Sequence, residues 1–170
     1  MRVRRGIVAL SGFALLAASI VAFRVTVDAW VPCEAELYSA GCLRAMDQNP
    51  AINGIVGILW VVGLALSITS VTVFSLTNSR PGTRWGVLLA VAGLVSLLIL
   101  NPFTDYLVAQ AFWSQEALWD SAPGTGYSTA AALGLASALT LGAVISTSPA
   151  APRDRSRIGR SSLSTGIPGV

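Results

Sequence analysis

The chain has 170 residues, of which 54% are hydrophobic and only 11% charged, and its mean hydropathy is +0.68. Soluble domains carry about 25% charged residues, so this composition excludes an ordinary soluble domain. The chain has no histidine, no lysine and only two cysteines, which leaves hydrolysis and metal catalysis without obvious side chains.

Four apolar stretches, at about 6–25, 51–77, 85–104 and 126–147, each approach the length that a membrane-spanning helix needs, roughly 20 residues. We therefore expect an all-α integral membrane protein with one domain, a four-transmembrane-helix bundle over 1–147. The remainder, 148–170, is rich in Pro, Ser, Gly and Arg, and this composition predicts a disordered basic cytoplasmic tail.

The charges are divided between the connections. Nine of the eleven arginines lie in the N-terminal segment, the second connection or the tail, and seven of the eight acidic residues lie in the first and third connections. By the positive-inside rule both termini are cytoplasmic, and the lipid bilayer is the first expected partner. The exclusive use of arginine suggests a GC-rich bacterial genome, hence the bacterial inner membrane. Orientation accounts for the arginines, so we expect no nucleic-acid binding.

The first apolar stretch follows Met-Arg-Val-Arg-Arg and could be a cleaved signal peptide. Its apolar run exceeds the 7–15 residues typical of that class, and three further stretches follow, so a retained helix is favoured. Within it Ala14, Ala18 and Ala22 recur every four residues, which indicates a surface for close helix contact.

The segment 24–50 is expected to be an outer loop, and it contains both cysteines, Cys33 and Cys42. In the oxidising compartment outside a bacterial inner membrane, a disulfide is the expected state. Two interpretations stay open: a structural staple that holds a small cap over the bundle, or a redox-active pair. A zinc site is not favoured, because two thiols lack the further ligands of a tetrahedral shell.

The second and third stretches should be antiparallel neighbours, because the turn between them is short. Trp60 is expected to pack against a neighbouring helix, and Asn101-Pro102 should end or kink the third helix. The segment 105–120 then predicts a helix lying at the membrane interface, since its acidic residues fall on one side and aromatic residues suit the headgroup layer.

The fourth stretch has the most regular pattern of small residues in the chain, one every four positions: Ala130, Gly134, Ala138, Gly142 and Ser146. Such a ridge lets two helix backbones approach closely, and we expect it to contact another helix over several turns. The pattern leaves open whether that helix belongs to this chain, to a second copy or to a partner protein.

Polar residues that could take part in chemistry gather near the outer boundary of the predicted bundle: Arg24, Asn53, Asn101 and Asp105, beside the two cysteines. No predicted span has an ionisable residue in its middle. Ion-coupled transporters usually need one, so that class is disfavoured.

The order of these features resembles the vitamin K epoxide reductase family and its disulfide-forming bacterial relatives. The Cys33–Cys42 pair is similar to that family's outer-loop cysteines, and Asn49-Pro50 leading to Gly54-Ile55 resembles its entry to the second helix. The resemblance implies a four-helix bundle that binds a quinone. The family's Cys-x-x-Cys is missing, however: Trp119 and Ala122 stand at its two thiol positions, and Leu43 replaces a frequent Ser.

Two functions are therefore weighed. The favoured one is a non-catalytic membrane accessory or assembly protein without a cofactor or metal, which acts through helix packing and its outer loop on a membrane-protein partner or a second copy of itself. The alternative is a quinone-linked thiol–disulfide oxidoreductase that has lost its quinone-facing dithiol.

Overall fold

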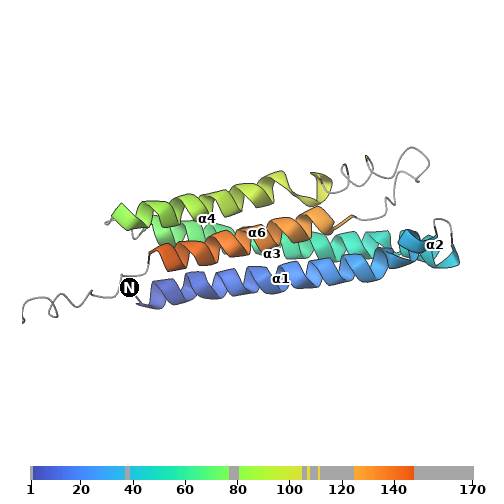
Figure 1. Cartoon of the computed structure of the whole chain (residues 1–170), viewed down its shortest axis with the longest axis horizontal. Helices are drawn as coiled ribbons and strands as arrows, with labels where there is room; N and C mark the ends of the chain where they lie inside the picture. The colour runs from blue at the N-terminus through green and yellow to red at the C-terminus, as the bar shows by residue number, and fades with distance from the viewer. Residues whose placement is uncertain are drawn as a thin grey trace, which may run out of the picture.

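The structure is a computed structural model, and it describes residues 2–36, 39–76, 81–104, 107, 111 and 125–147. Within these ranges the chain forms helices and no strands, as predicted. The helices are α1 (Arg2–Ala35), α2 (Ala40–Asp47), α3 (Asn49–Ser75), α4 (Pro81–Ile99) and α6 (Tyr127–Ser146) (Figure 1). The predicted interfacial helix falls largely outside the described residues, and the predicted tail falls wholly outside them.

Three of the described helices contain segments that are long and apolar enough to cross a membrane: Val3–Glu34, Ala51–Ser75 and Tyr127–Ser146. The fourth long helix, α4, contributes the shorter apolar segment Arg84–Ile99. The prediction of an all-helical membrane protein is confirmed to this extent.

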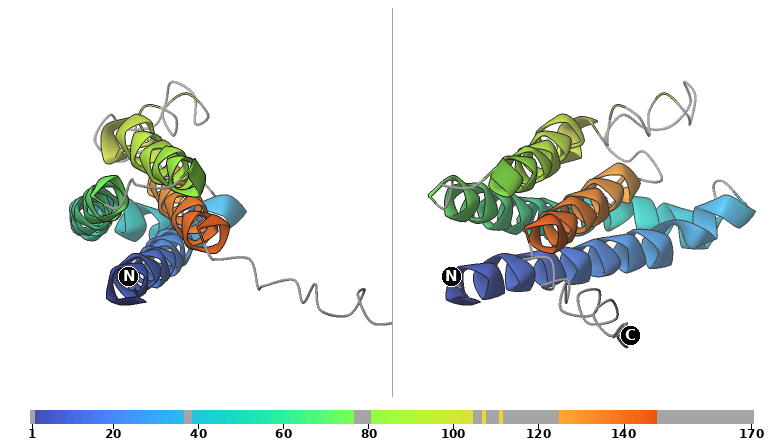
Figure 2. Two further views of the ribbon diagram at one scale, coloured as in Figure 1. Left: turned by 90° about the vertical axis from the view of Figure 1, so that its left-hand side faces the viewer. Right: turned by 60° about the vertical axis from the view of Figure 1, so that its left-hand side comes forward.

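The four long helices lie side by side and alternate in direction along the chain (Figures 1 and 2). Helix α6 packs against α1 and α4, while α3 packs against the same two helices from the other side, so α1 and α4 occupy opposite corners. The start of α1 and the end of α6 meet, since the Arg5 guanidinium donates a hydrogen bond to the Thr147 carbonyl.

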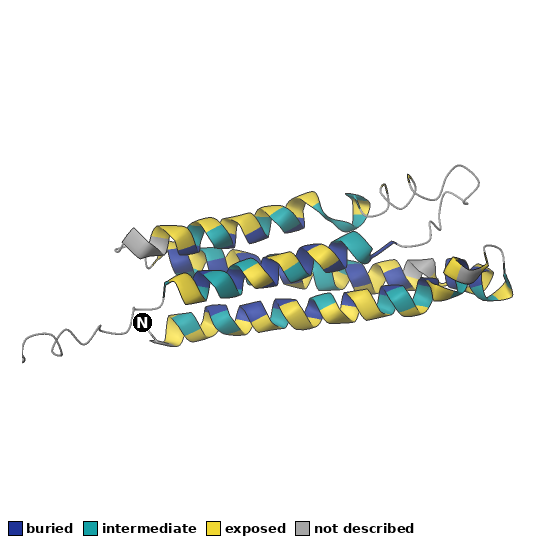
Figure 3. Ribbon diagram, viewed as in Figure 1, coloured by how far each residue is buried: buried dark blue, intermediate teal, exposed yellow. Residues whose placement is uncertain are grey.

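Small residues let these helices approach closely. A Cβ atom added to Gly93 of α4 would lie 3.3 Å from the Cα atom of Ala136 on α6, and at Gly12 of α1 it would lie 2.7 Å from Leu141 Cδ2. The core between the helices is built around Leu15, Leu97 and Leu133 (Figure 3). Close contact of this kind is how membrane helices associate when lipid supplies no hydrophobic drive.

The expected outer loop over 24–50 is wrong in its first part, because α1 continues as a helix to Ala35. At 1.5 Å per residue, its 34 residues extend about 51 Å, beyond the roughly 30 Å of a bilayer's hydrocarbon. The first charged residue of this segment, Arg24, suggested the end of the helix, but the helix continues with one buried face. Thr26 and Trp30 are buried, while Arg24 and Asp28 are exposed. A helix with one buried face remains stable outside lipid.

The extension of α1 and the short helix α2 reach past the beginning of α6 (Figure 1). We call the last turns of α1 together with α2 the cap, and the side on which they lie the cap end. Helix α4, the third predicted span, ends before Asn101-Pro102 as predicted. Asn101 Oδ1 accepts hydrogen bonds from the backbone N–H groups of Phe103 and Thr104, at 2.9 and 3.0 Å, and so caps a new helical turn.

Candidate functional site

The cap is held together by a disulfide between Cys33 in the last turn of α1 and Cys42 in the first turn of α2, with Cα atoms 4.6 Å apart. The predicted pairing is confirmed. Ser39 makes the tight connection between the two helices possible, because its hydroxyl accepts a hydrogen bond of 3.1 Å from the backbone N–H of Cys42 and so caps α2. The helices approach closely there, since a Cβ on Gly41 would lie 3.2 Å from Pro32 Cβ.

Both cysteines are enclosed. Cys33 is 2% exposed and Cys42 is fully buried, and they form one cluster with Trp30, Ala45 and Met46. The indole N–H of Trp30 donates a hydrogen bond of 3.2 Å to the Thr125 carbonyl, which ties the cap to the chain entering α6. Thiol–disulfide exchange requires a thiolate to reach a sulfur atom. In this arrangement an incoming thiol has no direct access, and the chain has no other cysteine to act as a relay.

The four residues of the predicted polar cluster do not all come together. Asn53 on α3 and Asn101 after α4 line one groove, whereas Arg24 is exposed on α1. Asp105 lies outside the described residues. Among the described residues, the structure thus brings two amides and no charged side chain to this groove.

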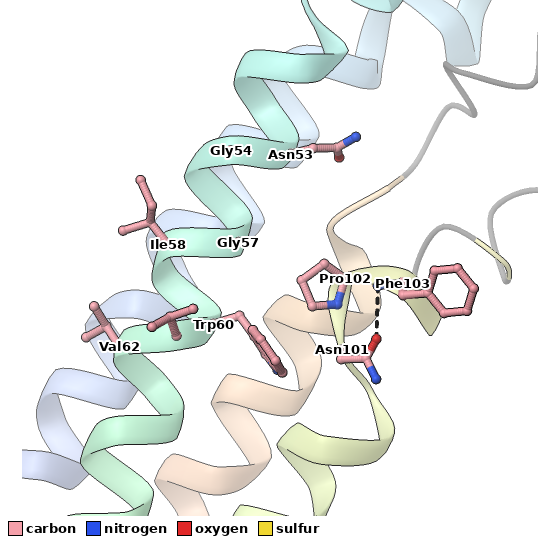
Figure 4. Close-up of a pocket in the computed structure, with 10 residues that line it drawn as sticks. Asn53, Gly54, Gly57, Ile58, Trp60, Val62, Asn101, Pro102 and Phe103 are labelled. Carbon is pink, nitrogen blue, oxygen red and sulfur yellow. Dashed lines mark hydrogen bonds between the residues drawn. The ribbon is translucent and has the colours of Figure 1, made fainter.

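This groove lies between α3 and the end of α4, toward the cap end, and has a volume of about 610 Å³ (Figure 4). Two glycines form part of its wall on α3, and a Cβ added to either Gly54 or Gly57 would meet no atom within 4 Å. The rest of the lining, besides the two amides, consists of Ile58, Trp60, Val61, Val62, Pro102 and Phe103. The sequence analysis missed this groove. The one feature of the sequence that could have indicated the groove is the glycine pair Gly54 and Gly57, on a predicted helix antiparallel to the one that ends at Asn101-Pro102.

Trp60 is used for packing, as predicted from its position. It is half-buried against the central core, and its indole N–H donates a hydrogen bond of 2.8 Å to the Leu97 carbonyl of α4. This bond gives the indole N–H a hydrogen-bond acceptor where water does not reach it, and it holds α3 to α4 beside the groove.

The ridge predicted on the fourth span is divided between two environments. Ala130 is buried, and a Cβ on Gly134 would lie 3.1 Å from the Ser19 hydroxyl of α1. Gly142 is half-buried beside Leu89 of α4, whereas Ala138 and Ser146 are exposed. The face of α6 with most of the buried residues is offset from the ridge and comprises Thr129, Ala130, Ala132, Leu133, Ala136, Ser137, Thr140 and Ala143.

Among the described residues, no group of three or more His, Cys, Asp or Glu side chains is placed to hold a metal ion. The described part of the chain therefore offers two features: a cap with a buried disulfide, and a groove between α3 and the end of α4 that is lined by two amides.

No family model, no curated protein and no solved structure matches this chain. The resemblance to the vitamin K epoxide reductase family accordingly stays a prediction from the sequence.

Proposed function

We propose that this protein is a non-catalytic, multi-pass accessory or assembly protein of the bacterial inner membrane that offers its cap to another membrane protein or to a second copy of itself. The observation that carries the proposal is the enclosed disulfide. A bond that no thiol can reach serves to fix α2 against α1, and it gives the cap a defined shape.

The cap also carries apolar side chains on its outside. Val31 on α1 is 48% exposed and Leu43 on α2 is 47% exposed, and both lie on the part of the chain that extends past α6. Apolar side chains on a rigid, water-facing element are typical of surfaces that contact other proteins. They are the natural candidates for the contact that the proposal requires.

Four membrane spans are part of the proposal, with α4 as the fourth. Support comes from its position beside α6, which is a candidate span itself. Gly86 near the start of α4 lies against Thr147 at the end of α6, and Gly93 lies against Ala136 in its middle. Two helices that match in depth over these turns would cross the same layer of lipid.

The orientation is proposed from the charges. Arg4, Arg5 and Arg84 lie at the end where α1 begins, while Asp28, Glu34, Glu36 and Asp47 lie toward the cap end. The positive-inside rule then places both termini in the cytoplasm and the cap outside.

A quinone-linked thiol–disulfide oxidoreductase remains the second candidate, with quinone as its cofactor. The feature in its favour is the disulfide itself, in the position that the family resemblance implies. The burial of both cysteines and the lack of a second cysteine pair argue against electron transfer through it.

The test is a pull-down of the tagged protein in mild detergent from membranes at native expression, with Leu43→Glu as the variant. Its matched control is Arg44→Gln, which makes the same change in charge at the neighbouring exposed residue. We expect a membrane protein, or a second copy, to co-purify with the wild type and the control but not with Leu43→Glu. Purification of the wild type as a lone monomer, or quinone reduction coupled to thiol oxidation by the pure protein, would contradict the proposal.

A further inference from the structure

The groove between α3 and α4 opens toward lipid. Its α3 wall belongs to the candidate span Ala51–Ser75, and Ile58, Val61 and Val62 are 66%, 57% and 45% exposed. Exposed branched side chains on a membrane-spanning helix face hydrocarbon, so the molecules that reach this groove are those dissolved in the bilayer. Its volume of about 610 Å³ lies within the range of small-molecule sites, roughly 300–1,000 Å³.

One end of the groove is polar, and the side-chain amides of Asn101 and Asn53 there differ in their hydrogen bonding. Asn101 is occupied: its Nδ2 donates to the Leu98 carbonyl at 3.0 Å, and its Oδ1 accepts two backbone hydrogen bonds. Asn53 is exposed and makes no hydrogen bond with any described residue. In Figure 4 its side chain extends from α3 on the side of Trp60 and Asn101. Asn53 is the third residue of the candidate span Ala51–Ser75, so its amide lies near the polar boundary of the bilayer and can donate to a polar group of a lipid.

We propose that the groove binds one acyl chain of a glycerophospholipid, whose ester carbonyl accepts a hydrogen bond from Asn53 Nδ2. The chain lies over Gly54 and Gly57, where the missing side chains leave the hollow, and runs along Trp60 toward the middle of the bilayer. This site goes beyond the proposed function, because it involves neither the cap nor a protein partner.

A lipid chain suits the groove better than a partner helix does. A helix is about 10–12 Å wide and would be held away from the glycines by Ile58 and Val61, whereas a flexible hydrocarbon chain can enter between them. A backbone carbonyl of a partner helix could accept from Asn53 only if that helix came close to α3, which these exposed side chains prevent. An ester carbonyl is a free acceptor.

Glycine substitutions test the hollow. The purified full chain is placed in nanodiscs with a phosphatidylcholine that carries a diazirine in its acyl chain, and labelled residues are mapped by mass spectrometry after illumination. We expect labelling of 53–62 and 101–103 in the wild type. The Cβ of Gly57→Leu would meet no atom within 4 Å, and the rest of its side chain would extend into the groove, so we expect the variant to fold but to lose this labelling. Gly6→Leu is the matched control, since Gly6 also has open space around it, and it keeps the wild-type pattern.

Asn53→Leu tests the polar contact. Diester phosphatidylcholine should compete with the probe about five-fold better than its diether analogue, which lacks ester carbonyls, because one hydrogen bond distinguishes them. In Asn53→Leu the two competitors become equal. Equal labelling of wild type and Gly57→Leu, equal competition in the wild type, or co-purification of a quinone or peptide in the groove would each overturn the proposal. None of these results depends on whether the cap has a protein partner.

Discussion

The Ser137 hydroxyl of α6 donates a hydrogen bond of 2.8 Å to the backbone carbonyl of Gly12 on α1, and both residues are buried. Two turns closer to the cap end, the Ser19 hydroxyl of α1 donates to the Ala130 carbonyl of α6, also at 2.8 Å. The bonds run in opposite directions between the same two helices. Each bond joins a short side chain of one helix to the backbone of the other, and small residues such as glycine and alanine keep the helices close enough for this.

Replacing Ser137 with Ala should lower the free energy of unfolding by about 0.6–1.7 kcal/mol, because hydrogen bonds between membrane helices contribute about that much. The measurement is reversible unfolding in mixed micelles by circular dichroism. Ser146→Ala is the control, since Ser146 is exposed and bonds within its own helix to the Ala143 carbonyl. Equal stability of the two variants would show that the α1–α6 bond adds nothing.

Gly93→Ala should be destabilising by roughly 1–3 kcal/mol, since the new Cβ would press against the backbone of Ala136 and force α4 away from α6. Gly54→Ala is the matched control, because its Cβ enters open space and alanine favours a helix. Folded yield and melting temperature in detergent measure both. The same melting temperature for Gly93→Ala and wild type would contradict the close α4–α6 contact.

Ala138→Leu should leave the folding of the single chain unchanged, because Ala138 is exposed on α6. Gly134→Leu should lower the folded yield, since its side chain would meet Ser19 of α1. Co-purification is scored beside the yield. If Ala138→Leu folds normally but loses a co-purifying protein, the exposed part of the small-residue ridge contacts a partner. Poor folding of Ala138→Leu as an isolated chain would contradict the arrangement of α6.

The double variant Cys33→Ala and Cys42→Ala should lose about 2.5–3 kcal/mol of stability, because it removes a short covalent loop from the unfolded chain. Insertion into the membrane should be unaffected. In the wild type, dithiothreitol should reduce the disulfide only after unfolding in dodecyl sulfate, because both cysteines are buried. Rapid reduction of the folded protein, followed by mass shift with an alkylating reagent, would support the redox alternative.

Gly126→Ala should be destabilising for two separable reasons. Gly126 has φ +114°, which alanine rarely adopts, and its Cβ would collide with the Thr26 hydroxyl. The backbone part costs about 1–2 kcal/mol. Adding Thr26→Ala should recover only the collision part, and a double-mutant cycle on melting curves separates the two. Full recovery in the double variant would exclude the backbone contribution.

Much of the fold could be predicted from local sequence patterns, because a bilayer restricts the length and composition of the helices that cross it. Apolar length and composition predicted the positions of α3, α4 and α6, because a helix in lipid must satisfy its own backbone groups and cover about 30 Å. The end of α4 was predicted from Asn101-Pro102, since proline interrupts a helix locally. The disulfide was predicted because two cysteines in one connection have only each other as partners. Each of these features depends on residues near one another in the sequence.

The features that set the candidate sites depend on contacts between distant segments, and the tertiary structure decided them. The extension of α1 to Ala35 depends on the burial of Trp30 beside Thr125, which lies 95 residues away. The packing face of α6 is offset from its small-residue ridge, because α1 and α4 together select which side is enclosed. The groove exists because Asn101-Pro102 of one helix end comes to lie beside Gly54 and Gly57 of another. A sequence pattern describes what each helix surface offers, but only the packed bundle determines which surfaces remain uncovered.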